Sequence, residues 1–273
     1  MNTKKPIFNL LSLPSLLLLG SVVLLQISCS KKVEEFDTEP LSDYIPLQVG
    51  KYITYRVDST VFTNFGTVEE THSYLMKHVI DSEIPDNLGR PSYRVFRYIS
   101  NINDTTGTPD WIPTTTYFIT SLSDQIEVIE DNLRFIKMHV PIKEGFTWKG
   151  NKYLFSGTCD GGAIGPYCPL YNFSNDDFLA DWDFYFDSFE SAVTYRGQTY
   201  SDVYTIEQFD EAFNVPITNP NAYASLSRGV EKYSKTIGLV YKEYALWEYQ
   251  PNPGGSGPYK VGFGVKMWMV DHN

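Results

Sequence analysis

The chain has 273 residues, with 33 acidic against 22 basic side chains and a formal net charge of −11. An acidic protein repels phosphate backbones and anionic head groups, so we expect no nucleic-acid partner and no basic membrane-binding patch. Tyrosine and phenylalanine are abundant, at 20 and 17 residues, and aromatic side chains favour the pleated surface of a β-sheet.

The N-terminal segment has the order of an export signal. Lys4 and Lys5 precede an apolar run from Ile7 to Leu25, and Gln26-Ile27-Ser28 then leads to Cys29. This order resembles the signal peptides of bacterial lipoproteins, although Gln26 stands where that family usually has an aliphatic residue. The resemblance implies that residues 1–28 are removed and that Cys29 carries acyl chains such as palmitate. It also implies an outer-membrane lipoprotein of the cell envelope, on the periplasmic face or at the cell surface.

Two other interpretations of this segment stay open. An ordinary secretory signal is cut after a small-x-small site, which Gln26-Ile27-Ser28 does not supply. An uncleaved membrane helix needs about 20 apolar residues, and Pro14 and several serines interrupt this run. Under the lipoprotein interpretation, loss of Lys4 and Lys5 takes the net charge from −11 to −13.

The region after the signal divides into a tether and one domain. Residues 29–43 are polar, charged and aperiodic, which predicts a flexible tether. Residues 44–273 are enough for a single all-β domain. The only helix-friendly stretch is 221–231, so we expect one or two short helices at most. Alternating runs between turn signals predict antiparallel strands at 52–62, 68–80, 93–99, 111–119, 126–129, 133–140, 192–195, 200–206, 232–247 and 259–270.

Three separated segments resemble recurring segments of uncharacterised Bacteroidetes-type lipoproteins. The first runs from Tyr44 to Tyr55 (YIPLQVGKYITY), the second from Gly145 to Asn151 and the third from Lys232 to Val240. Lys51 and Ile53 depart from the pattern of the first segment. The resemblance implies a curved antiparallel sheet or a partly open barrel. It implies no reaction, because that group has no activity to carry over.

Residues 157–190 break the strand pattern and hold two cysteines, Cys159 and Cys168. An even pair in an exported protein usually forms a disulfide, and the span between them is rich in Gly and Pro. We therefore predict a Cys159–Cys168 disulfide that holds a local loop. A metal site and two free thiols are the alternatives, but no His lies nearby and the spacing matches no zinc pattern.

Acidic and aromatic residues alternate from Asp181 to Asp187. In an extended segment Asp181, Asp183, Tyr185 and Asp187 share one face, and the intervening aromatic residues share the other. We interpret this as an amphipathic strand or loop whose aromatic residues enter the core. The alternative is a Ca²⁺ site formed by Asp181, Asp183 and Asp187, because hard cations take several carboxylate oxygens.

No motif points to catalysis. The four histidines show no metal-ligand spacing, and the chain has no Gly-x-Ser-x-Gly elbow, P-loop or His-Glu-x-x-His. We assign no catalytic residue and no cofactor, and we expect a protein that is not an enzyme. The expected function is a lipid-anchored, non-catalytic binding or structural module whose ligand, a glycan, a lipid or a protein, is unknown. The alternative is a surface hydrolase that acts on glycan or peptide.

Overall fold

The computed structural model describes residues 38–103, 109–154 and 182–273, and these form the unit from Thr38 to Asn273. Its centre is a single antiparallel sheet of twelve strands in the order β6-β5-β4-β3-β2-β1-β12-β11-β10-β9-β8-β7. The predicted fold class is confirmed. One 3-10 helix, η1 (Leu41–Asp43), precedes the sheet. The strands are β1 (Tyr52–Thr63), β2 (Val68–Pro85), β3 (Pro91–Asn101), β4 (Ile112–Ser121), β5 (Gln125–Glu130), β6 (Leu133–His139), β7 (Thr147–Lys149), β8 (Asp183–Tyr195), β9 (Gln198–Phe213), β10 (Ala224–Ser234), β11 (Gly238–Gln250) and β12 (Tyr259–His272).

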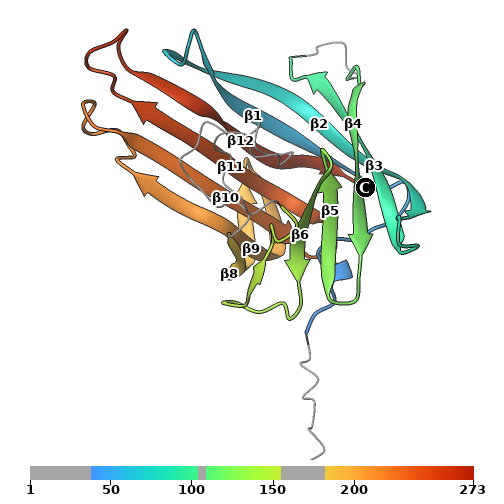
Figure 1. The fold of residues 1–273 in the computed structure, drawn as a ribbon. Coiled ribbons are helices and arrows are strands. Elements are labelled where there is room, and N and C mark those ends of the chain that lie inside the picture. The colour runs from blue at the N-terminus through green and yellow to red at the C-terminus, as the bar shows by residue number, and fades with distance from the viewer. Residues whose placement is uncertain (1–37, 104–108, 155–181) are drawn as a thin grey trace, which may run out of the picture. The chain divides into compact units, whose positions relative to one another are not determined.

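The sheet consists of two meanders joined along one seam (Figure 1). In each meander, neighbouring strands in the sheet are also neighbours in chain order among the described strands. The seam is the antiparallel pair β1–β12, in which Val57 lies opposite Met267. The N-terminal and C-terminal strands of the domain therefore lie at the middle of the sheet, and β6 and β7 lie at its edges.

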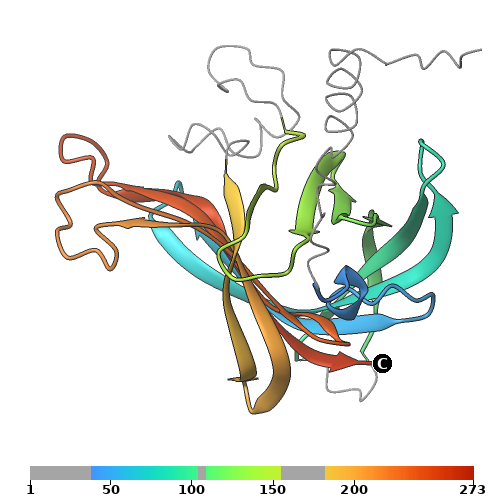
Figure 2. The ribbon, with the colours of Figure 1, turned by 90° about the horizontal axis from the view of Figure 1, so that it is seen from below.

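The sheet curves until these two edges approach each other. The amide of Ile136 on β6 donates to the carbonyl of Gly150, just after β7, at 2.8 Å. The indole Nε1 of Trp148 donates to the carbonyl of Ile136 at 2.9 Å. Figure 2 shows the sheet curving around the segment that contains η1. The domain is thus a nearly closed barrel whose edges are joined by a few hydrogen bonds instead of a full strand ladder.

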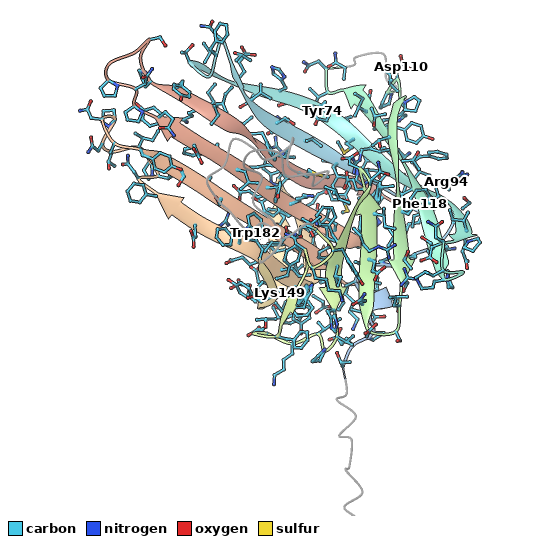
Figure 3. The ribbon with its side chains drawn as sticks, in the orientation of Figure 1. Tyr74, Arg94, Asp110, Phe118, Lys149 and Trp182 are labelled. Atoms are coloured by element: carbon cyan, nitrogen blue, oxygen red, sulfur yellow. The ribbon has the colours of Figure 1, made fainter. Side chains whose placement is uncertain are left out.

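Alternation along the strands separates the two faces of the sheet. Arg94 and Phe118 are register partners on β3 and β4, and they lie side by side in Figure 3. Arg94 precedes the buried Val95, and Phe118 follows the buried Tyr117. Because side chains alternate along a strand, Val95 and Tyr117 point to the opposite face. The enclosed face therefore receives every second side chain, as the alternating sequence predicts.

The predicted aromatic face of 181–187 lies in the largest core cluster. Trp182, Phe184 and Phe186 are buried, whereas Asp183 and Asp187 are exposed. Trp182 stacks on Phe209 with ring centroids 4.7 Å apart. This region lies where the labels of Trp182 and Lys149 stand in Figure 3. The amphipathic interpretation is confirmed for the described part of the segment.

Two of the sequence-based assignments are wrong. The stretch 221–231, expected to favour a helix, forms most of β10, which pairs with β9 on one side and β11 on the other. Sheet pairing overrides the weak local preference of the sequence. The run 232–247, expected as one strand, is divided by a turn in which Thr236 and Gly238 have φ angles of 67° and 115°.

Two boundaries in the structure also differ from those predicted from the sequence. The packed domain begins before residue 44, because Leu41 is buried in the core cluster although the sequence placed it in the tether. At the other boundary, residues 183–190 are the first part of β8, so the irregular stretch predicted over 157–190 ends earlier. Among the described residues, no helix combines the length and apolar character needed to cross a membrane.

Candidate functional site

A cavity of about 150 Å³ lies among the described residues inside the curved sheet. Volumes of this order hold a molecule the size of benzene, and they are smaller than typical pockets for drug-sized ligands. The lining comes from strands β1 to β6 and β10 to β12 and from the stretch that follows η1. This interior cavity is the candidate functional site.

Most of the lining is apolar. Leu47 packs against the small core cluster of Ile80, Val95 and Tyr117, which forms one part of the wall. The apolar lining residues are Ile45, Pro46, Leu47, Ile53, Ile80, Val95, Ile119, Val128, Ile237, Leu239 and Met267. Such a wall favours an apolar group of a ligand, because binding removes that group from water.

The stretch from Glu39 to Lys51 crosses the enclosed side of the sheet, and we call it the strap. The amide of Thr236 donates to the carbonyl of Asp43 at 2.6 Å, and Lys51 Nζ donates to the carbonyl of Thr236 at 3.2 Å. Lys235 Nζ forms ion pairs with Glu39 at 2.8 Å and Asp43 at 3.3 Å. These contacts fix the strap to the β10–β11 hairpin, so that its residues form a wall of the interior cavity.

Six charged side chains also line the interior cavity. Four are basic, Lys51, Arg97, Lys137 and Lys242, and two are acidic, Glu130 and Glu231. The site therefore has a surplus of positive charge inside a protein whose formal net charge is −11. A concave site lined with one sign of charge attracts ligands of the opposite sign.

Glu231 holds one group of these charges together. Its carboxylate accepts from Lys137 Nζ at 2.9 Å and from the Tyr233 hydroxyl at 2.8 Å, and Lys242 Nζ lies 3.4 Å away. Burial would raise the pKa of Glu231, but Lys137 and Lys242 lower it to about 2. Glu231 is therefore ionised at neutral pH. Burial lowers the pKa of Lys137, and the nearby Glu231 charge opposes that shift.

Arg97, His78 and Tyr117 form a chain of hydrogen bonds on the opposite side of the seam. Arg97 Nε donates to His78 Nε2 at 3.1 Å, and His78 Nδ1 lies 3.1 Å from the Tyr117 hydroxyl oxygen. A guanidinium only donates, so Nε2 must be the unprotonated nitrogen and Nδ1 carries the proton. Nδ1 then donates to Tyr117, which leaves the hydroxyl hydrogen of Tyr117 without an acceptor among the described residues.

The charge of His78 is fixed by its surroundings. Burial lowers the pKa of His78 well below 6.5, and the positive charges of Arg97 and Lys242 lower it further. His78 is thus neutral at physiological pH. Arg97 also forms an ion pair with Glu130 at 2.6 Å. Burial would raise the pKa of Glu130, but Arg97 and Lys242 outweigh this effect and lower it.

The polar groups that line the cavity are largely engaged with one another. The described residues that line the cavity include no Ser, Thr, Cys or Asp. Both ring nitrogens of His78 are engaged, and its lowered pKa moves it away from the range in which a general base works best at neutral pH. The cavity therefore presents an apolar wall beside fixed donors and charges.

The described site residues expected from the sequence, Asp183 and Asp187, do not line the cavity. Cys29, Cys159, Cys168 and Asp181 are outside the described residues, so the lipidation, disulfide and Ca²⁺ predictions stay predictions. Asp183 forms an ion pair with Lys149 at 3.0 Å. Within the part of the chain that the structure describes, no three His, Cys, Asp or Glu side chains gather as metal ligands.

The sequence did not single out the residues of the interior cavity, yet it contains a signal for them. Two of the three segments that resemble Bacteroidetes-type lipoproteins, 44–55 and 232–240, supply eleven of its lining residues. The third segment, 145–151, contributes Trp148 to the core instead. A second signal is Arg97, a charged residue on the same predicted face of its strand as the apolar Val95.

Comparisons with known proteins add little. No protein-family model matches the chain. No curated protein matches it either. One solved structure, named as a candidate outer membrane lipoprotein-sorting protein domain from Vibrio parahaemolyticus, aligns with 12% identity over 82% of this chain and 85% of that chain. Its TM-score of 0.19 is too low to support an inference about fold or function.

Proposed function

We propose that this protein is a non-catalytic binding module of the bacterial cell envelope. In this proposal, acyl chains on Cys29 anchor it in the outer membrane, and the curved sheet holds a small ligand in the interior cavity. The observation that carries the binding function is the cavity itself, with its apolar wall and fixed charges. The anchor rests on the order of residues from Lys4 to Cys29.

The geometry of the charged residues supports binding over hydrolysis. A hydrolase needs a nucleophile or activated water beside a general base of suitable pKa. The imidazole of His78 accepts from Arg97 and donates to Tyr117, and Glu231 accepts from Lys137 and Tyr233. No feature of the described residues favours the alternative of a surface hydrolase for glycan or peptide.

Blocking the cavity tests the binding function. Val128 lines the cavity and is only partly buried, so Val128→Phe fills the space without the strain of overpacking a closed core. Native mass spectrometry of protein purified from envelopes should show a bound small molecule that the variant lacks. Ile129→Phe is the matched control, because the adjacent Ile129 does not line the cavity. A bound species retained by Val128→Phe would contradict the proposal.

Replacing Cys29 tests the anchor. Wild-type protein should enter the detergent-rich phase in a phase-separation experiment, because stable anchoring requires two or more acyl chains. Cys29→Ser should move the protein to the aqueous phase, whereas Cys168→Ser, which keeps Cys29, should not. The lipoprotein proposal fails if the Cys29→Ser variant stays in the detergent-rich phase.

A further inference from the structure

We propose that the interior cavity selects a small carboxylate that carries an apolar group, with the carboxylate held by Lys242 and the Tyr117 hydroxyl. This inference rests on the proposed binding function and specifies its ligand. Three features of the cavity lead to it: the surplus of positive charge, the unequal engagement of the basic residues, and the free donor on Tyr117.

The basic residues differ in how firmly they are engaged. Arg97 has Glu130 at 2.6 Å, and Lys137 has Glu231 at 2.9 Å. Lys242 is farther from Glu231, at 3.4 Å, and Glu231 already accepts from Lys137 and Tyr233. Of the three basic lining residues that pair with a carboxylate, Lys242 therefore has most capacity to bind an added anion. The fourth, Lys51, donates to the carbonyl of Thr236 at 3.2 Å.

Lys242 influences most of the other ionisable groups that line the cavity. Its positive charge affects the pKa values of His78, Glu130, Lys137 and Glu231, which come from four different strands. His78 in turn contacts the Tyr117 hydroxyl. Lys242 and Tyr117 both line the cavity, with Lys242 Nζ 3.4 Å from Glu231, so the same small space holds a charge and a neutral donor for one anion.

The carboxylates of Glu130 and Glu231 also line the cavity, but Arg97 and Lys137 engage them, so Lys242 and Tyr117 contribute donors. Arg97 fixes the tautomer of His78, and His78 then directs its proton to the Tyr117 oxygen, so that Tyr117 must donate its own hydrogen elsewhere. Ammonium groups also only donate. A carboxylate, which only accepts, matches this set, and charge-assisted hydrogen bonds are the stronger kind.

The apolar wall determines the rest of the ligand. Gly238 brings the strap and β1 close together, since a Cβ at this position would lie 3.2 Å from Ile53 Cδ1 and 3.9 Å from Pro46 Cδ. On this side Ile45, Pro46, Leu47, Ile237 and Leu239 form an apolar wall, which suits an apolar group better than a row of sugar hydroxyls. A short alkyl or aromatic group fits both the chemistry and a volume of about 150 Å³.

The test compares ligands that share a tail and differ in the head group. Hexanoate, hexanol and hexylamine are titrated by calorimetry into the full-length protein in nanodiscs, with empty nanodiscs as the blank. Acetate tests the head group alone. Hexanoate should bind at least about tenfold more tightly than the other three, a difference within the range of one charge-assisted contact.

Variants then locate the head group. Lys242→Met should weaken hexanoate about tenfold or more and leave hexanol unchanged, and Tyr117→Phe should weaken hexanoate less. Lys266→Met is the matched control, because Lys266 is half-exposed, pairs with Glu243 at 3.0 Å and does not line the cavity. If Lys242→Met fails to fold, the head-group series and Tyr117→Phe still decide the question.

The other outcomes separate the two proposals. Equal binding of hexanol and hexanoate, both lost in Val128→Phe, would overturn the carboxylate inference and retain a binding cavity. Tighter binding of hexylamine would overturn it in the same way. Hexanoate binding that Val128→Phe does not change would place the ligand outside the cavity and overturn both proposals.

Discussion

The neutral state of His78 makes the stability of the domain depend on pH. The folded protein keeps His78 unprotonated well below its ordinary pKa of 6.5, because burial and two nearby cations oppose the charged form. The unfolded chain takes up a proton there as the pH falls through about 6.5. Since the unfolded state then binds more protons, acid favours unfolding.

We therefore expect the free energy of unfolding to fall between about pH 7 and pH 5, by up to about 1.4 kcal/mol per pH unit from this residue. His78→Asn should flatten this slope, as measured by urea unfolding at several pH values. The lowered pKa of Glu231, about 2, removes stability only in more acidic solution, below its ordinary pKa of 4.5.

His72→Asn is the control for this prediction. His72 lies on the same strand, but its side chain is 59% exposed and contacts Glu70 at 3.0 Å. Its replacement should leave the slope close to that of the wild type. A His78→Asn protein with an unchanged slope would show that His78 does not carry the effect.

At the scale of single residues, the sequence predicted only part of the site. The alternation of β3 placed Val95 and Arg97 on one face, and both do line the cavity. It did not show that Arg97 meets His78 and Glu130, because these contacts depend on the register between β2 and β3 and on the curvature that brings β5 near. Register and curvature are properties of paired strands and cannot be read from one strand alone.

At the scale of elements, the strap joins the start of the domain to the wall of the cavity. It contains no strand, and its position depends on the β10–β11 hairpin. Gly238 begins β11 with a φ angle of 115°, which side chains rarely adopt, and a Cβ there would press on Ile53 and approach the strap. Local backbone geometry in one hairpin thus sets the shape of the binding site.

Gly238→Ala should therefore destabilise the domain and weaken ligand binding. Gly257→Ala is the matched control, because Gly257 has a φ angle of 98° and a Cβ there would meet nothing within 4 Å. The control should lose about 1–3 kcal/mol from backbone strain, and Gly238→Ala should lose more because packing is added to strain. Equal losses in urea unfolding would show that the contact with the strap is unimportant.

The sequence predicted most elements well where one face is apolar and the other polar. β1 and β12 were found almost to their ends, and the strand β10 was missed. β10 has neighbours on both sides and contains Gly229, Ser227 and Glu231, so it lacks the regular pattern of a half-exposed strand. The strap was missed for another reason, since its order comes from long-range contacts with Lys235 and Thr236.

At the scale of the molecule, the barrel is closed by few contacts between β6 and β7. The Trp148 indole and the Ile136 amide supply two of them, at 2.9 and 2.8 Å. A full strand ladder would offer many more hydrogen bonds, so the edges should open more readily than the middle of the sheet. Local opening here need not disturb the β1–β12 seam.

Hydrogen exchange tests this view of the edges. Trp148→Phe removes the indole donor, and exchange of the Ile136 amide should become faster while amides at the β1–β12 seam keep their wild-type rates. Trp268→Phe, a change of the same kind on β12, should leave Ile136 unaffected. Uniformly faster exchange across the sheet would instead mean that the whole domain is destabilised.

The order of the strands also has a consequence for how fast the protein folds. Ten of the eleven strand pairs join strands that are consecutive among the described ones, so each meander can form from neighbouring hairpins. Among these strand pairs, only the β1–β12 seam joins strands from opposite ends of the domain, as Val57 and Met267 show. Forming it closes a very long loop, and such non-local pairings are slow. Assembly of the barrel thus depends on one encounter between its two halves, which the short stretch 140–146 connects in the chain.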